Sequence, residues 1–241
     1  PRLAIAFAPI AGNVRGALDA AGLGDVELAV VGGEAAGATP IEALLALDAG
    51  DPYAEPDLAP EDLAAVPFSS GTSGLPKGVR LTHGNLAAAA EQGICAVGSG
   101  GGYDERSVVL AGAPFFHSIG LTLMLCGPLR LGATIVTLPR PVLQPLLELV
   151  AEHRVTHIAV PPPLFDELAV DPSVDDHDLS SLRTVVTGGA HMHPDVEEAL
   201  SARLGCMARQ GYGATEATCT IAAPLDRPST PATDHAVSSL P

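Results

Sequence analysis

Short apolar runs rich in β-branched residues alternate along the chain with longer segments whose apolar residues recur at helical spacing. The runs that predict short buried strands are Leu3–Phe7, Val26–Val31, Val108–Ala111, Thr134–Leu138, Thr156–Val160 and Thr184–Val186. The segments that predict helices are Ala11–Ala21, Ile41–Leu47, Asn85–Val97, Val142–Arg154 and Pro194–Leu204. Near-continuous apolar strands that alternate with helices are typical of sheets covered on both faces. The pattern therefore predicts an α/β fold with mainly parallel sheets flanked by helices.

The stretch from Ser107 to Leu129 contains no formally charged residue and is long enough to be mistaken for a membrane span. It is interrupted, however, by Pro114, His117 and Pro128 and by several glycines. We therefore expect a buried strand, a loop and a core helix in this stretch, and no membrane span.

Two proline-rich segments break the alternation of strands and helices. Asp48–Pro60 is acidic and carries three spaced prolines, so we expect it to be a connecting loop. Pro224–Pro241 shows little apolar periodicity, and we expect a loosely ordered tail after a folded core of residues 1–223.

The composition favours a packed domain, because 47% of the residues are hydrophobic and only 17% are charged. The formal net charge of −16 argues against nucleic-acid binding, which needs a basic surface. An anionic ligand must then be held by a local site, against the field of the whole molecule.

The cysteines form neither a CxxC pair nor a zinc-like spacing; they are Cys95, Cys126, Cys206 and Cys219. Free thiols in a reducing compartment are the expected state, which favours a cytoplasmic protein. Pro1 leads directly into a strand-like run, so we expect no signal peptide.

The single lysine of the chain, Lys77, lies in the glycine- and hydroxyl-rich segment Ser69–Gly78. Backbone N–H groups and hydroxyls of such a loop can surround phosphate oxygens, while the ammonium acts as a point charge against them. A flexible surface linker is the alternative, but the loop is richer in glycine and hydroxyl residues than ordinary loops are. The spacing is not that of a Walker A motif, because Pro76 precedes the lysine and Gly78 follows it. The glycines also lack the spacing of a dinucleotide fingerprint.

Three segments carry a resemblance to a known family. Phe68–Val79, followed by Leu81-Thr82-His83, resembles the signature loop of the adenylate-forming enzymes, which include acyl-CoA synthetases, luciferases and peptide-synthetase adenylation domains. Ala113–His117 and Gln210–Ala217 resemble the second and third motifs of that family, in the same order. The chain is therefore similar to the central part of the large N-terminal domain of the adenylate-forming fold, as found in 4-coumarate–CoA ligases and related acyl- or aryl-CoA ligases.

The resemblance implies four catalytic residues. Lys77 would contact the β- and γ-phosphates of ATP, and His117 would lie beside the carboxylate of the acid. Thr215 would bond the α-phosphate, and Glu216, with Thr72, would hold Mg²⁺. These roles agree with the chemistry, since adenylation brings two anions together and charge neutralisation is its main catalytic task.

The resemblance also implies a nucleotide site in which Tyr212 stacks on adenine and the turn after Thr187 lines the adenine pocket. The candidate nucleotide-binding residues are Ser70, Gly71, Thr72, Ser73, Gly74, Lys77, Gly189, Ala190, Gly211, Tyr212, Gly213 and Thr215. His191-Met192-His193 departs from the family pattern at this turn, and we interpret its histidines as a pocket rim or solvated turn rather than a metal site.

A second pair, His153 and His157, has the spacing of helical metal ligands. The second histidine falls in a predicted strand, so no metal pair is expected there.

The pocket for the acid is expected to be lined by His117, Ile119, Leu123 and Met192. Their apolar surroundings favour an aryl or medium aliphatic carboxylic acid over a small or charged one.

The resemblance implies an ATP-dependent carboxylic acid–CoA ligase, with ATP, Mg²⁺ and CoA as its small-molecule partners. A carboxylate and ATP would give acyl-AMP and pyrophosphate, and the acyl group would then pass to CoA. Two alternatives stay open: an adenylation module of the peptide-synthetase or fatty-acyl-AMP ligase type, and a non-catalytic remnant used for binding.

Several family features have no counterpart in this sequence. Nothing matches the Thr-Gly-Asp segment whose aspartate binds the ribose hydroxyls. Because Lys77 is the single lysine, the catalytic lysine of the family's C-terminal lid domain is also missing, as is the lid itself. We therefore expect a partial adenylation core that is inactive alone.

The 241-residue chain by itself is accordingly expected to bind ATP–Mg²⁺ weakly, because the ribose and lid contacts are missing. Isothermal titration calorimetry measures this affinity directly. Sub-micromolar binding, or robust release of pyrophosphate by the chain alone, would contradict the expectation.

Overall fold

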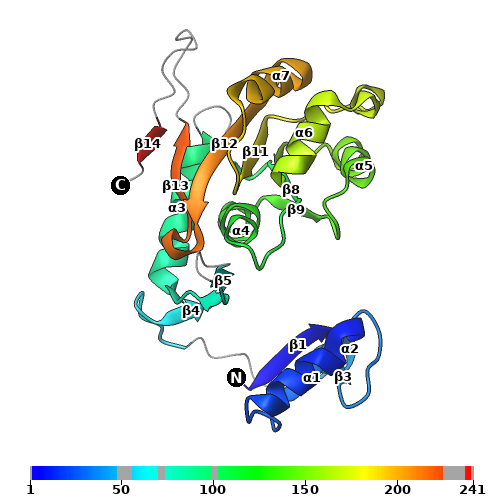
Figure 1. Cartoon of the computed structure of the whole chain (residues 1–241), viewed down its shortest axis with the longest axis vertical. Coiled ribbons are helices and arrows are strands. Elements are labelled where there is room, and N and C mark those ends of the chain that lie inside the picture. Colours follow the sequence, from blue (N-terminus) through cyan, green and yellow to red (C-terminus); the bar gives the residue numbers. More distant parts are fainter. Residues whose placement is uncertain (1, 48–55, 70–73, 99–102, 225–236, 240–241) are drawn as a thin grey trace. The chain divides into compact units, whose positions relative to one another are not determined.

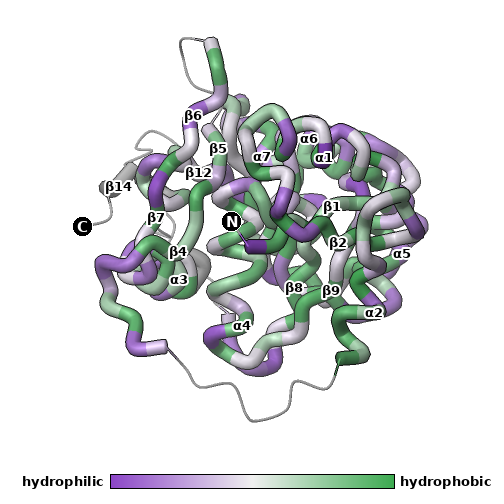
Figure 2. The backbone as a smooth tube through the Cα atoms, turned by 90° about the horizontal axis from the view of Figure 1, so that it is seen from below, coloured by the Kyte–Doolittle hydropathy of each residue, from purple (hydrophilic) through white to green (hydrophobic). Residues whose placement is uncertain are grey.

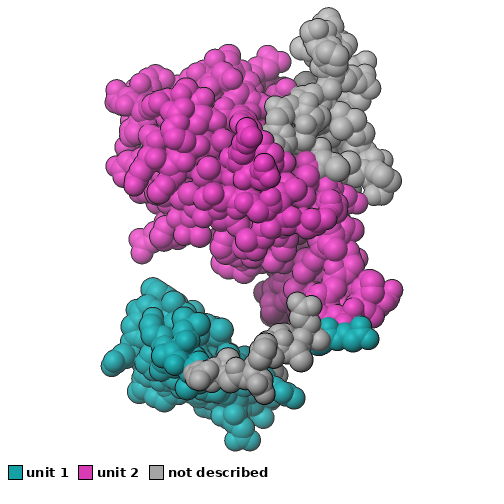
Figure 3. Space-filling model, turned by 180° about the vertical axis from the view of Figure 1, so that it is seen from behind, with its two compact units in different colours: residues 1–57 teal, residues 58–241 magenta. Residues whose placement is uncertain are grey.

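The computed structural model describes residues 2–47, 56–69, 74–98, 103–224 and 237–239. The chain divides into two compact units, residues 1–57 and residues 58–241 (Figure 3). Each unit has its own sheet and its own hydrophobic core, so the two are described in turn.

The first unit is a small parallel sheet with helices. Its strands β1 (Leu3–Phe7), β2 (Glu27–Val31) and β3 (Thr39–Pro40) pair in the order β1-β2-β3. The 3₁₀ turn η1 (Ala8–Ile10) and helices α1 (Ala11–Ala20) and α2 (Ile41–Leu45) complete it. Side chains alternate along β1, where Ala6 is buried with Leu28 and Val30 while Leu3, Ile5 and Phe7 are exposed.

The second unit is built on a seven-stranded sheet with the order β14-β13-β12-β11-β10-β8-β9 (Figure 1). Its parallel strands are β8 (Val108–Ala111), β9 (Thr134–Thr137), β10 (His157–Ala159), β11 (Thr184–Gly188) and β12 (Met207–Ala214). Two antiparallel strands, β13 (Cys219–Pro224) and β14 (Val237–Ser239), extend one edge. The predicted α/β fold with a mainly parallel sheet is confirmed.

One row of side chains crosses four strands of this sheet. Leu110, Ile158, Val185 and Ala208 are neighbours in register, and each is almost fully buried. They pack against the helices α5 (Leu143–His153), α6 (Pro162–Val170) and α7 (Pro194–Leu204). Because period-2 alternation sends the next residues to the opposite face, this row fixes which side chains of each strand face which layer.

The opposite face carries a smaller cluster around Val109, Ala111, Ala159, Met124 and Tyr103. Helices α3 (His83–Gly98) and α4 (Gly127–Leu131) lie on this side, while α5, α6 and α7 lie on the other (Figure 1). Strand β8, buried between the two layers, is hydrophobic along its length (Figure 2). The sheet is therefore covered on both faces, as its near-continuous apolar strands require.

The uncharged stretch after Ser107 folds as a strand, a connection and helical turns, as predicted. Strand β8 is followed by the π-helical segment η2 (Gly120–Cys126), which continues into α4. A Cβ at Gly120 would collide with the carbonyl oxygen of Pro114, so this tight turn requires glycine. No helix among the described residues is long and apolar enough to cross a membrane.

The helices end where local backbone signals end them. Helix α5 stops at Arg154 and α7 at Gly205, both in the left-handed region with φ of 52° and 64°. The His193 imidazole caps the start of α7, and Pro194 occupies its first position. The predicted bounds of α7 are confirmed, and those of the other predicted helices are within two residues.

Two short antiparallel strand pairs lie before α3, and the hydrophobic pattern did not predict them. Strand β4 (Leu63–Ala65) pairs with β7 (Leu81–Thr82), and β5 (Phe68–Ser69) pairs with β6 (Lys77–Gly78). Strands of two or three residues are too short to show alternation, and long-range pairing defines them.

The proline-rich segments are only partly covered. Of the expected loop Asp48–Pro60, residues 48–55 lie outside the described residues. In the tail, residues 225–236 also lie outside them, whereas Val237–Ser239 forms β14 against β13. Cys126 and Cys206 are free thiols, as predicted.

Leu168 and Val170 provide a matched test of the α6 packing, because the first is 0% and the second 78% exposed on the same helix. Leu168→Ala is expected to lower the free energy of unfolding by about 2–5 kcal/mol through the cavity that it leaves. Val170→Ala is expected to change it by less than about 0.5 kcal/mol. Urea denaturation of both variants measures these changes, and equal losses would contradict the assigned packing.

Candidate functional site

The second motif, the Gly189 turn and the end of the third motif each come after the carboxyl end of a parallel strand. Strands β8, β11 and β12 end at Ala111, Gly188 and Ala214, and the segments that contain His117, Gly189 and Thr215 come directly after them. Strand β9 lies on one side of β8, and β10, β11 and β12 lie on the other. The direction of the strand order thus reverses beside β8, which is where open α/β sheets bind ligands.

The third motif forms a tight turn between β12 and β13. The turn is the 3₁₀ segment η4 (Thr215–Ala217), closed by a 3.0 Å hydrogen bond from the Thr218 amide to the Thr215 carbonyl. Thr218 adopts a left-handed backbone with φ of 61°. This turn leaves Glu216 exposed and Thr215 half-buried at the carboxyl edge of the sheet.

Lys77 lies on the β5–β6 hairpin, where it pairs in register with Ser69. The side chain of Lys77 is exposed, and so is Gly74, whose φ of +123° favours glycine. Ser70, Gly71, Thr72 and Ser73, at the centre of the predicted phosphate loop, lie outside the described residues. The structure therefore places both ends of that loop.

A hydrogen bond joins the first motif to the third. The Ser69 hydroxyl donates to Oε1 of Glu216 over 2.8 Å, although the two residues are 147 positions apart. The pKa of Glu216 is held below its ordinary value by the residue's own backbone N–H, by the Ser69 hydroxyl and by the charge of Lys77. The Glu216 side chain is thus an ionised carboxylate that accepts a hydrogen bond from the first motif.

His117 is exposed in the connection between β8 and η2. Its amide donates to the carbonyl of Pro114 over 3.0 Å, and its Nδ1 accepts from the amide of Ile119 over 3.4 Å. With Nδ1 as the acceptor, the neutral ring carries its proton on Nε2. The ring can therefore present a donor to a carboxylate.

The apolar residues predicted around the acid do not all come together. Ile119 and Leu123 are half-buried in the cluster around Val109, and Ile119 lies 3.5 Å from where a Cβ on Gly188 would stand. Met192 is buried in the cluster of α5, α6 and α7, on the other face of the sheet. The structure therefore places Met192 in the core and not beside Ile119 and Leu123.

The turn that contains Gly189 and Ala190 is held by a side chain to which sequence reasoning assigned no role. The side-chain amide of Gln210 accepts a hydrogen bond at Oε1 from the Met192 N–H and donates one from Nε2 to the Met192 carbonyl, both over 3.1 Å. The Gln210 side chain thereby satisfies backbone groups of the turn that no strand in the described part of the chain pairs with. Gly189, in the same turn, has a φ of +95°. Gln210 opens the third motif, and its position there was the one signal in the sequence.

Tyr212 is 65% exposed on β12, in the part of the strand that follows the buried pairing with β11. One residue earlier, Gly211 lies very close to Gly188. A Cβ on Gly188 would stand 3.0 Å from the carbonyl oxygen of Gly211. The pairing with β13 shifts between Tyr212 and Gly213, a bulge that re-aims side chains. An open aromatic face flanked by glycines is suited to stacking on a flat ring.

No protein-only metal centre is found among the described residues, since they contain no group of three or more His, Cys, Asp and Glu side chains that could hold an ion. His191 is exposed, while His193 accepts from the Asp195 amide over 3.4 Å and so caps α7. His157 is buried in β10 against the ring of Tyr103. His157 thus packs in the core, and His193 serves as a helix cap.

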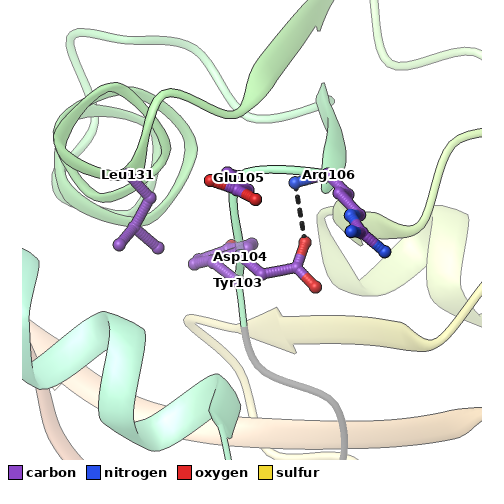
Figure 4. A pocket seen from close by; sticks show the side chains of 5 residues that line it. All are labelled: Tyr103, Asp104, Glu105, Arg106 and Leu131. Carbon is purple, nitrogen blue, oxygen red and sulfur yellow. Dashed lines mark hydrogen bonds between the residues drawn. The ribbon is translucent and has the colours of Figure 1, made fainter.

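A separate hollow of about 520 Å³ lies at the opposite, amino end of β8 (Figure 4). It is lined by Tyr103, Asp104, Glu105, Arg106 and Leu131. Asp104 accepts from the Arg106 amide over 2.9 Å and contacts Arg183 over 3.5 Å, so its carboxylate is already occupied. No residue of the three motifs lines this hollow, and it is not part of the candidate site.

Comparison with known proteins agrees with this arrangement. The family model of the AMP-binding enzymes matches residues 9–239. 4-Coumarate–CoA ligase 1 of Oryza sativa subsp. japonica is 43% identical over 171 residues, which cover 70% of this chain and 30% of that protein. 4-Coumarate–CoA ligase 3 of Arabidopsis thaliana is 39% identical over 180 residues, covering 74% and 32%.

Among solved structures, a benzoate CoA ligase from Burkholderia xenovorans matches with a TM-score of 0.75 and 27% identity, covering 100% of this chain and 49% of that one. The chain spans about a third of the length of the curated relatives that it matches. The family model, the relatives and the arrangement of the three motifs lead to one conclusion: the chain belongs to the family of AMP-binding enzymes.

Proposed function

We propose that the protein carrying this chain activates a carboxylic acid with ATP and transfers the acyl group to the thiol of CoA. The observation that carries the proposal is the hydrogen bond from Ser69 to Glu216, which holds the hairpin of Lys77 beside the turn of Thr215. The similarity to 4-coumarate–CoA ligases and to a benzoate CoA ligase supports both the adenylation and the choice of CoA as acceptor.

In the first step, an oxygen of the carboxylate attacks the α-phosphorus of ATP. The bond between the α-phosphorus and the bridging oxygen breaks, and pyrophosphate leaves with the electron pair. In the second step, the sulfur of CoA attacks the acyl carbon, AMP leaves, and the thiol proton is released. Both steps need cationic groups that neutralise phosphate charge.

Lys77 is proposed to neutralise the leaving pyrophosphate. It is exposed on β6, opposite Ser69, whose hydroxyl is bonded to Glu216, and is the single lysine of a chain with a net charge of −16. In such a field, a fixed local cation is needed to hold a polyphosphate. The residues of the adjoining loop, Ser70, Gly71, Thr72, Ser73 and Gly74, are proposed to surround the phosphate oxygens.

Glu216 fits a magnesium ion that is shared with the nucleotide. Its carboxylate is exposed and ionised, and hard divalent cations prefer oxygen ligands of this kind. We propose Glu216 and Thr72 as the protein ligands of Mg²⁺, which when bound would offset charge on the phosphate oxygens. So few protein ligands are typical of Mg²⁺ sites that are completed by phosphates and water.

The nucleotide is proposed to lie along the end of β12. The open ring of Tyr212 would stack on adenine, while Gly211 and Gly213 leave room beside it. Gly189 and Ala190, exposed in the turn held by Gln210, would line the pocket. Thr215, at the start of the next turn, would bond the α-phosphate.

The acid is proposed to bind beside His117, with Nε2–H directed at its carboxylate. Ile119 and Leu123, which follow His117 along the chain, would supply apolar contacts to the rest of the acid. An aryl or medium aliphatic acid suits such surroundings, because a charged group there would lose its hydration.

Lys77→Ala in the protein that carries this chain is expected to slow acid-dependent pyrophosphate release by about 100-fold, because a cation is lost where charge develops on the leaving group. Binding of the acid alone should be nearly unchanged. Arg80→Ala is the matched control, since Arg80 is exposed, cationic and three residues away. Stopped-flow pyrophosphate release and acid titration measure the two effects. An unchanged rate in Lys77→Ala, or an equal loss in Arg80→Ala, would show that the phosphate role of Lys77 is wrong.

A further inference from the structure

The hydroxyl of Ser69, at the start of the loop, is bonded to an acceptor in the third motif. A serine hydroxyl carries one donor, and in Ser69 that donor is bonded to Oε1 of Glu216 over 2.8 Å. The residue lies on β5, in register with Lys77 across the hairpin. The half-buried side chain of Ser69 thus contacts the Glu216 carboxylate, and it does so from the strand that pairs with Lys77.

The hairpin depends on such contacts for its position. Strands β5 and β6 form a sheet of their own, and within the described residues no backbone ladder joins them to the seven-stranded sheet. A two-stranded hairpin is only marginally stable in water without further packing. The bond from Ser69 connects it to the η4 turn, which β12 and β13 hold in the large sheet.

The bond also limits the rotation of the Glu216 side chain. An exposed glutamate on a turn samples several rotamers, and a hydroxyl bonded to one oxygen selects among them. With Oε1 bonded to Ser69, the lone pairs of Oε2 stay available to a cation or to solvent.

We propose that Ser69 is a positioning residue, which holds the Glu216 carboxylate against the hairpin that carries Lys77 before any ligand binds. The inference rests on the proposed function only for the roles of Glu216 and Lys77 toward ligands. The geometry itself belongs to the ligand-free chain, so it is tested there first.

Amide hydrogen exchange of the 241-residue chain without nucleotide provides that test. The Val79 amide, bonded to the Pro67 carbonyl over 2.8 Å, reports on the hairpin, and the Thr218 amide reports on the turn. Ser69→Ala is expected to speed exchange at both amides by about three- to tenfold, because opening of either element becomes easier. Ser69→Thr, which restores the hydroxyl, should return both rates to those of the unmodified chain.

Ser180→Ala is the matched control. The Ser180 hydroxyl also donates to a carboxylate, Oδ1 of Asp178, over 2.6 Å, and Ser180 belongs to none of the three motifs. Its removal should leave the Val79 and Thr218 amides unchanged. Unchanged rates in Ser69→Ala, or equal acceleration in Ser180→Ala, would overturn the proposal.

Glu216 provides a second set of variants that separates geometry from charge. Glu216→Gln keeps an oxygen that can accept from Ser69, so exchange at Val79 should stay close to that of the unmodified chain. Glu216→Ala removes the acceptor and should match Ser69→Ala, and combining the two alanines should add nothing. Additive effects would mean that the two side chains act separately, and would overturn the proposal.

A cation measurement then connects the positioning to the site. Titration of Mn²⁺ into the protein that carries this chain, with ATP present and followed by electron paramagnetic resonance, is expected to show about tenfold weaker binding in Ser69→Ala and rescue in Ser69→Thr. If that protein with Ser69 unchanged shows no ATP-dependent Mn²⁺ binding, the proposed function fails, while the exchange rates still decide the role of Ser69. Unchanged Mn²⁺ affinity in Ser69→Ala would refute positioning.

Discussion

Parallel pairing of β8, β10, β11 and β12 is the constraint on which the candidate site depends. Parallel strands end at one edge, so segments that are distant in sequence leave the sheet side by side. The buried row from Leu110 to Ala208 fixes the register of these strands, because a shift by one residue would move that row into the opposite layer. The second and third motifs are thus positioned by apolar packing that contains none of their chemistry.

Electrostatics adds a second constraint. The chain carries a net charge of −16, yet its proposed substrates are anions. Such a protein needs a local cation and ordered donors at the point where phosphates bind. Lys77 on a short hairpin, a glycine-rich loop beside it and an ionised Glu216 suited to a divalent ion meet that need within one small region.

The elements that the sequence predicted correctly are those whose stability comes from local pattern and burial. Strand β8 and helix α7 have the predicted bounds, since each combines a continuous apolar or periodic run with clear boundary residues. The three motifs were also recognised in order, because their residue types are unusual together.

Part of what the sequence did not show depends on contacts between distant residues, although the local helix α6 was also not predicted. The β5–β6 hairpin consists of two-residue strands, and the bond from Ser69 to Glu216 spans 147 positions, so neither leaves a local pattern. Met192 was predicted in the acid pocket from its place after the Gly189 turn. Its side chain lies in the core instead, because the segment leads directly into α7 and packs with the cluster of α5, α6 and α7.

Exchange of labelled pyrophosphate into ATP, with the protein that carries this chain, tests the central claim most directly. Reversible adenylation predicts that label enters ATP only when a suitable carboxylic acid is present, and that CoA is not needed for the exchange. Label that enters ATP without acid, or cleavage of ATP to ADP and phosphate, would contradict the account.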